Sequence, residues 1–227
     1  MAIVKNFTSP ALPLPAQNYD LLSESDKIRV FRLYFNLLDR YLNDVTTILN
    51  GGSANLGLLL PHIAASDSTD QIAGGNNTAT VVKWNTLDSG YLWDLNSPGS
   101  ATAQIPGVYT IRYSLQFINT ANAIHFATVW LKVNNVDVAN SATKFFIPAR
   151  KSASAGEEGY LCGYSEATFS VGVGDEIELY WATDVAGNPT TPTDGVYMFH
   201  DAAQTTPFVR PAIPSAIGSI VWVSGPT

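Results

Sequence analysis

Hydrophobic and polar residues alternate in the second half of the chain, which is the pattern of a strand with one buried face. The alternation is strongest over residues 109–117. The apolar side chains of this segment are predicted to face a core: Tyr109, Ile111, Tyr113, Leu115 and Phe117. A later strand over residues 176–181 repeats the pattern and adds Ile177, Leu179 and Trp181 to that core.

Shorter strands are predicted elsewhere in this half of the chain, over residues 127–133, 144–147, 167–173, 196–200 and 219–223. The first of them leads into two adjacent asparagines, which tolerate the positive φ of a two-residue hairpin turn. No helical periodicity separates the strands. The pattern therefore predicts a mainly β fold with an antiparallel sandwich or barrel, and excludes a parallel sheet with crossover helices.

One helix is predicted before the strands, over residues 23–50. Capping hydroxyls and acids begin it, and Asn50-Gly51-Gly52 ends it. Apolar residues recur between these ends at alternating spacings of three and four, which is the heptad seam of a coiled coil. The seam consists of Ile28, Phe31, Phe35, Leu38, Leu42, Val45 and Leu49. We expect this helix to associate with copies of itself; an amphipathic helix packed on its own domain is the alternative.

Residues 1–22 are predicted to form an extended arm. Closely spaced prolines remove backbone donors and hold the chain extended, and the apolar side chains between them are unfavourable in water unless they dock. We expect the arm to anchor the protein to a particle through Phe7, Pro10, Leu12, Pro13, Leu14 and Pro15. A disordered tail is the alternative.

The remaining boundaries follow from composition. Residues 51–77 are rich in glycine and small polar residues and are predicted to be a linker. Leu58-Leu59-Leu60 is an apolar exception within it, either a strand or a plug against the next domain. The β head is expected over residues 78–200, and residues 201–227 are expected to form a C-terminal extension with a final strand.

Composition excludes several classes of protein. Charged residues make up 14% of the chain and the net charge is -7, so the excess of Lys and Arg that nucleic acid requires is missing. The single cysteine, Cys162, excludes an intrachain disulfide and is expected to be buried. No apolar run approaches the roughly 20 residues of a membrane-spanning helix, and the start lacks the apolar core of a secretion signal. We expect assembly in a cytoplasm and no membrane insertion.

Catalytic patterns are weak. His62, His125 and His200 share no metal-binding spacing. His125 lies within an apolar strand and His200 ends one, so these two are expected to be structural. The adjacent acids Glu157-Glu158 and Asp175-Glu176 point to opposite faces of an extended chain, so neither pair forms an acid–base site by itself. The sequence therefore predicts no catalytic residue, no metal and no cofactor.

Three segments resemble one family of domains. The run Ile105-Pro106-Gly107-Val108-Tyr109 resembles the Pro-Gly-x-Tyr strand of the jelly-roll domains in complement globular heads and tumour-necrosis-factor-like ligands. Leu131-Lys132-Val133-Asn134-Asn135 is similar to the central hairpin of that family, and Val173-Gly174-Asp175-Glu176-Ile177 to its penultimate strand. The resemblance implies a jelly roll and a homotrimer. Residues 214–223 go beyond the family pattern, as an extra strand or an intersubunit contact.

The order of the whole chain is similar to that of small virion proteins of tailed phages, particularly phages of marine bacteria. It is carried by Ser9-Pro10-Ala11-Leu12-Pro13-Leu14-Pro15, then Phe31-Arg32-Leu33-Tyr34-Phe35, then a jelly roll. The resemblance implies a homotrimeric capsid decoration or fibre protein, anchored by its arm to other virion proteins of the capsid or tail. One alternative is a receptor-binding knob that recognises a host surface glycan through Tyr and Trp on exposed loops such as residues 184–194. A secreted ligand of the tumour-necrosis-factor type is the other, and would require a signal or membrane anchor.

Overall fold

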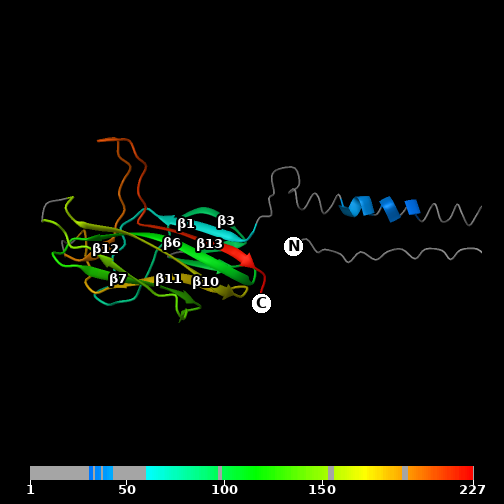
Figure 1. Cartoon of the computed structure of the whole chain (residues 1–227), viewed down its shortest axis with the longest axis horizontal. Coiled ribbons are helices and arrows are strands. Elements are labelled where there is room, and N and C mark those ends of the chain that lie inside the picture. Colours follow the sequence, from blue (N-terminus) through cyan, green and yellow to red (C-terminus); the bar gives the residue numbers. More distant parts are fainter. Residues whose placement is uncertain are drawn as a thin grey trace, which may run out of the picture. The chain divides into compact units, whose positions relative to one another are not determined.

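The computed structural model describes residues 31, 32, 34–36, 38–42, 60–96, 99–152, 156–190 and 194–226. The chain divides into two units, Met1–Leu59 and Leu60–Thr227. The described residues of the first unit are helical, and those of the second form a β sandwich (Figure 1). The arm and the seam positions Ile28, Val45 and Leu49 lie outside the described residues.

Sheet A has six strands in the order β10-β6-β13-β1-β3, with β12 also paired to β6. All of its neighbouring strands are antiparallel. The strands are β1 (His62–Asp67), β3 (Thr86–Tyr91), β6 (Gly107–Asn119), β10 (Gly159–Val171), β12 (Val196–Met198) and β13 (Ala216–Ser224). The two longest, β6 and β10, run side by side along their whole length.

Sheet B has seven strands in the order β4-β5-β11-β7-β8, with β2 also paired to β11 and β9 to β7. Its pairs are antiparallel as well. The strands are β2 (Thr80–Val81), β4 (Trp93–Asn96), β5 (Ser100–Ala103), β7 (His125–Val133), β8 (Val136–Asp137), β9 (Thr143–Ile147) and β11 (Glu176–Thr183).

The strand pairs are nested along the chain. β1 pairs with β13, β5 with β11, β6 with β10, and β7 with β9. The first strand of the sandwich therefore meets the last, and the strands between them pair in the same inward order. This is the connectivity of a jelly roll. The predicted mainly β fold, an antiparallel jelly-roll sandwich, is confirmed.

The core lies between the two sheets. The eight side chains that alternation places there come from β6 and β11, and all eight are buried. Phe117 of sheet A and Trp181 of sheet B have ring centroids 6.0 Å apart, so aromatic contact joins the two layers. Tyr109 meets the Trp93 ring edge-on at 5.0 Å, and its hydroxyl donates to the Ile105 carbonyl at 2.9 Å.

The predicted hairpin turn is present between β7 and β8. Asn134 and Asn135 have φ angles of 51° and 64°, and Val133 pairs with Val136 across the turn. Positive φ at both central residues gives a backbone twist that matches the right-handed twist of the strands, which is why asparagine is favoured there.

Two boundaries differ from those that composition suggested. β1 lies within residues 51–77, which were expected to be a linker, and it pairs with β13 and β3. The strand β13 lies between β6 and β1 near the centre of sheet A, so residues 201–227 are not an appendage to a head that ends at residue 200. β1 consists largely of small and polar residues, and only pairing with distant strands makes it part of the sheet. A strand was predicted within residues 201–227, but its place between β6 and β1 likewise depends on pairing with distant segments.

Candidate self-association face

The outer surface of sheet A carries few charges where β6, β10 and β13 run together. Alternation directs one set of side chains on these strands away from the core. We call this set the sheet A face: Thr110, Arg112, Ser114, Gln116, Tyr160, Cys162, Tyr164, Glu166, Thr168, Ile217, Ser219 and Val221. Its members come from strands far apart in the chain, which are brought together by the pairs β6–β10 and β6–β13.

The two charged members of the sheet A face neutralise each other. Arg112 Nε lies 3.1 Å from Glu166 Oε2, and both side chains are 55% exposed. Tyr160 donates its hydroxyl to Glu158 at 3.0 Å; burial, then this hydrogen bond and the Glu158 charge, raise the pKa of Tyr160 to about 12. The phenol therefore stays neutral at physiological pH, and this face has no net charge.

A hollow of about 260 Å³ opens in the sheet A face. The Tyr164 ring and the Ile217 side chain line it together with Arg112, Ser114 and Ser219. Tyr164 is 58% exposed and Ile217 46% exposed, so two large side chains beside the hollow remain in contact with water in the single chain.

Cys162 is exposed, and its predicted burial is wrong. Cys162 is an even-numbered residue of β10, like Tyr160 and Tyr164, and alternates with the odd-numbered residues, which face the core. Its sulfur lies 3.1 Å from Ser114 Oγ and accepts a hydrogen bond from Gln116 Nε2 at 3.5 Å. Ser114 also lines the hollow, so the thiol lies next to one of the residues that line it.

The described part of the helix leaves its seam open to solvent. Residues 31–42 are helical wherever they are described, and Phe31, Phe35 and Leu42 are 46%, 58% and 52% exposed. Leu38, the fourth seam residue in this part, is partly buried. In aqueous solution, apolar seam positions of this kind become buried when the helices of several copies associate.

The outer surface of sheet B differs. Charged side chains alternate there with aromatic ones, and we call this set the sheet B face: Phe126, Thr128, Trp130, Lys132, Lys144, Phe146, Glu176, Glu178 and Tyr180. Lys144 Nζ lies 3.6 Å from the centre of the Phe126 ring and 5.6 Å from that of Phe146. Burial and the neighbouring Glu176 charge raise the pKa of Glu178.

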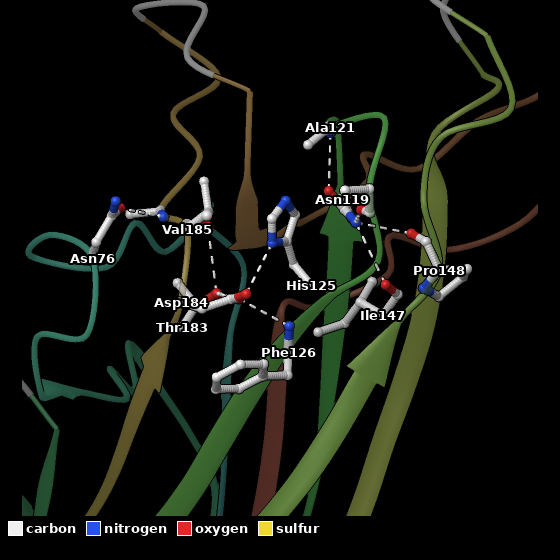
Figure 2. Close-up of polar contacts among 12 residues, drawn as sticks. Asn76, Asn119, Ala121, His125, Phe126, Ile147, Pro148, Thr183, Asp184 and Val185 are labelled. Carbon is white, nitrogen blue, oxygen red and sulfur yellow. Dashed lines mark hydrogen bonds and ion pairs between the residues drawn. The ribbon is translucent and has the colours of Figure 1, made fainter.

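A polar network ties the ends of the strands together (Figure 2). His125 Nδ1 lies 2.9 Å from Asp184 Oδ2, and the Phe126 backbone amide donates to Asp184 Oδ1 at 3.0 Å. Partial burial opposes ionisation of Asp184, but the hydrogen bonds from His125 and Phe126 outweigh it, and the pKa of Asp184 lies below its usual value. The contact holds the start of β7 to the end of β11. His125 therefore has the structural role that the sequence suggested.

His62 is also held by the protein itself, through contacts at both ring nitrogens. Nδ1 lies 2.9 Å from the Leu60 carbonyl and Nε2 lies 3.0 Å from Ser89 Oγ. Among the residues that the structure describes, no three His, Cys, Asp or Glu side chains gather as a metal site. Within the same residues, no helix combines the length and apolar character needed to cross a membrane.

The loop over residues 184–194 does not fit the predicted role in glycan recognition by aromatic side chains. It contains no Tyr or Trp. Its two acids make contacts within the protein: Asp184 holds His125, and Asp194 pairs with Arg150 at 3.2 Å. Exposed aromatic side chains lie instead on the sheet faces, with Phe146 64% exposed on sheet B.

Comparison with known proteins adds one structural likeness. No protein-family model matches the chain, and neither does any curated protein. Among solved structures, the chain is similar to the globular domain of the zebrafish complement 1qA protein, with 14% sequence identity and a TM-score of 0.42. The match covers 73% of this chain and 99% of that one. The jelly roll itself rests on the strand pairing described above.

Proposed function

We propose that this protein is a structural protein of a tailed-phage virion, a homotrimer that decorates the capsid or forms a fibre. Residues 1–22 anchor it to other virion proteins, and the jelly roll projects outward. The observation that carries the proposal is the sheet A face, a neutral surface with exposed Tyr164 and Ile217 beside a hollow. The similarity in chain order to small phage virion proteins supports the choice of particle.

Desolvation favours the sheet A face as the contact between copies. Removing charged groups from water is costly, and the cores of protein interfaces are depleted in charge and enriched in tyrosine. This face exposes one charged pair whose members already satisfy each other, Arg112 and Glu166. Covering it therefore buries apolar and hydroxyl groups without leaving an unpaired charge.

The helix supports association of more than two copies. Its apolar seam, widened by the flanking residues Tyr34, Tyr41 and Ile48, suits three or more helices better than a pair, and the resemblance of the head to a trimeric family favours three. Cyclic symmetry brings the same surface of each copy into the same environment, so self-association of the head is compatible with self-association of the helix. A chain with 14% charged residues then exposes less apolar surface than a monomer would.

Trimerisation strengthens anchoring through the arms. Once one arm of a trimer has docked, the other two are held near their sites at a high effective concentration. Three contacts that are individually modest therefore hold the trimer on the particle for a long time. The low affinity of a single arm is compatible with stable decoration.

Deletion of residues 1–22 tests the proposal. We expect the truncated chain to stay a soluble trimer by light scattering and to be missing from particles purified after infection, in which the full-length chain is present. A second variant, with Leu12 and Leu14 replaced by serine, keeps the length of the arm and is expected to be depleted as well. Normal incorporation of both variants would disprove anchoring by the arm.

The aromatic and cationic end of the sheet B face favours a second role, recognition of a host surface glycan. The rings of Phe126 and Phe146 lie 6.3 Å apart with Lys144 above them. Within the described residues, no carboxylate forms an ion pair with Lys144. Aromatic faces that stack on a sugar ring, together with a cation, suit a sugar that bears an acid group. Such binding is compatible with a fibre or decoration protein, because the sheet A face is used for association.

A further inference from the structure

A hairpin between β12 and β13 projects from the sandwich. We call residues 201–213 the finger; they are drawn in orange in Figure 1 and extend clear of the strands. Backbone hydrogen bonds join Asp201 with Ile213 at 3.0 and 2.7 Å, and Gln204 with Arg210 at 3.1 and 3.0 Å. With about six residues on each side at roughly 3.3 Å per residue, the finger reaches on the order of 20 Å from its base.

The tip of the finger is apolar and open to water. Phe208 is 62% exposed and Val209 is 81% exposed. Single exposed hydrophobic residues are common on protein surfaces, whereas Phe208 and Val209 are adjacent and lie together at the end of a projection. Since both are so exposed, the tip does not pack against its own sandwich.

The finger is held in shape by contacts within itself. The guanidinium of Arg210 pairs with the carboxylate of Asp201 across the hairpin. Its Nη1 also donates to the carbonyls of Ala202 at 3.1 Å and Pro211 at 3.0 Å. These contacts order the finger before any partner is present, which lowers the entropy lost when the tip docks.

The hollow in the sheet A face is a suitable acceptor for the tip of another copy. The finger leads directly into β13, and residues Ile217 and Ser219 of that strand line the hollow. Each copy therefore has its acceptor beside the base of its own finger, while the apolar tip lies away from it. A projection and a recess at separate places on one surface form a heterologous contact, and such contacts close into rings when the rotation allows.

We propose that Phe208 and Val209 of each copy dock in the hollow between Tyr164 and Ile217 of the next copy, so that the fingers clasp the trimer as a closed ring. The occupant of the hollow is thus a second copy of this chain. This inference rests on the proposed homotrimer and adds the contact that determines its geometry. It also gives the exposed tip and the hollow a common function.

The native thiol of Cys162, which contacts Ser114 in the lining of the hollow, provides the test. Replacing Val209→Cys places a second thiol at the tip, and docking brings it close to Cys162 of the neighbouring copy, where a disulfide can form under mild oxidation. In a closed ring each chain is linked to two neighbours, so the expected product is a covalent trimer on a non-reducing gel. A contact that is symmetric between two copies would give covalent dimers and would overturn the ring.

Two controls separate docking from random collision. Ile124→Cys introduces a thiol at another exposed apolar position, 66% exposed and outside the finger, and is expected to form at least tenfold less cross-linked product. Val209→Cys combined with Cys162→Ser is expected to stay uncross-linked; a disulfide between two tips in this variant would also overturn the proposal.

The mass of the wild-type protein distinguishes failure of the clasp from failure of the proposed function. A wild-type trimer whose Val209→Cys variant forms no more cross-linked product than Ile124→Cys would disprove the clasp and leave the trimer intact. A wild-type monomer at micromolar concentration in light scattering would disprove the trimer, and the clasp with it.

Discussion

The outer faces of the two sheets differ in charge although their inner faces build one core. The sheet A face exposes Arg112 and Glu166, which pair with each other. The sheet B face carries two lysines and two glutamates on β7, β9 and β11. Covering sheet B would remove water from four charged side chains, whereas covering the tyrosine-bearing face of sheet A would remove water from one charged pair whose members already satisfy each other. The same strand alternation thus produces one face suited to solvent and one suited to a copy.

The difference also separates two kinds of contact. Association between copies requires a broad surface that can be buried without leaving unpaired charges, and sheet A meets that requirement. Recognition of a small group at the surface requires a few convergent side chains, and Phe126, Phe146 and Lys144 of sheet B provide them. Under the proposed function, the jelly roll holds its neighbours with one sheet and presents the other outward.

The largest expected effect is on the stability of the trimer, when a carboxylate is placed on the sheet A face and, for comparison, on the sheet B face. Tyr164→Asp puts an unpaired carboxylate beside the hollow of the sheet A face, and we expect the dissociation constant of the trimer to rise at least 100-fold, or about 3 kcal/mol. Phe146→Asp makes a matched change on the sheet B face and is expected to leave association unchanged. Analytical ultracentrifugation of both variants measures the difference.

Equal effects of these two substitutions on association would contradict the distinction between the faces. Circular dichroism and thermal unfolding serve as controls, because Tyr164 and Phe146 are both more than half exposed and neither belongs to the core. An unchanged trimer in Tyr164→Asp would assign association to the helix alone.

A smaller effect is expected from removing the aromatic and cationic groups of sheet B. Phe146→Ala and Lys144→Ala are each expected to weaken binding of the full-length protein to host cells about tenfold, since one stacking or cation contact is worth about 1.4 kcal/mol. Flow cytometry with labelled protein measures the binding. Thr168→Ala on the sheet A face is the matched control and is expected to bind normally; parallel losses in all three variants would count against a sheet B site.

The smallest effect concerns the contact that joins β7 to β11 in sheet B. Asp184→Asn removes the carboxylate that holds His125 and is expected to lower the free energy of unfolding by about 1 kcal/mol at pH 7. Because the pKa of Asp184 is lowered in the folded protein, this stabilisation is present above the usual value of 3.8 and is lost as the pH falls through the folded pKa. The free energies of unfolding of wild type and variant, measured by denaturant unfolding, should therefore converge as the pH falls below the folded pKa of Asp184.

A matched comparison sharpens this prediction. Asp194→Asn removes the partner of Arg150 from a pair whose acid is 56% exposed, and it is expected to change stability by less than about 0.5 kcal/mol. If the difference in free energy of unfolding between wild type and Asp184→Asn stayed constant from pH 7 to pH 2, the carboxylate charge would not contribute to stability.

The local sequence pattern was sufficient to predict much of the sandwich. Alternation in β6 and β11 identified eight core side chains correctly, because the parity of a strand is a property of consecutive residues. The hairpin at Asn134 and Asn135 was predictable for the same reason, since the turn depends on two adjacent residues that tolerate positive φ. The mainly β class followed from the number of such segments.

Other features could not be read from local pattern. β1 resembled a linker because its residues are mostly small or polar, and Ile63 and Ala65 become buried only when the strand pairs with β13 and β3. Cys162 was misplaced because its burial depends on which parity of β10 faces the core. The finger had a weak signal, Asp201 and Arg210 among closely spaced prolines, but its projection depends on where β12 and β13 join the sheet.

By itself the sequence determined the class of the fold and eight of the core residues, because periodicity and turn chemistry act between near neighbours. The sheet A face, its hollow and the exposure of the Cys162 thiol were decided only by the tertiary structure. They are made by β6, β10 and β13, which lie apart in the chain and become neighbours through strand pairing. A surface shared by distant segments has no local pattern, so the residues proposed to meet another copy emerge only when the sheet is assembled.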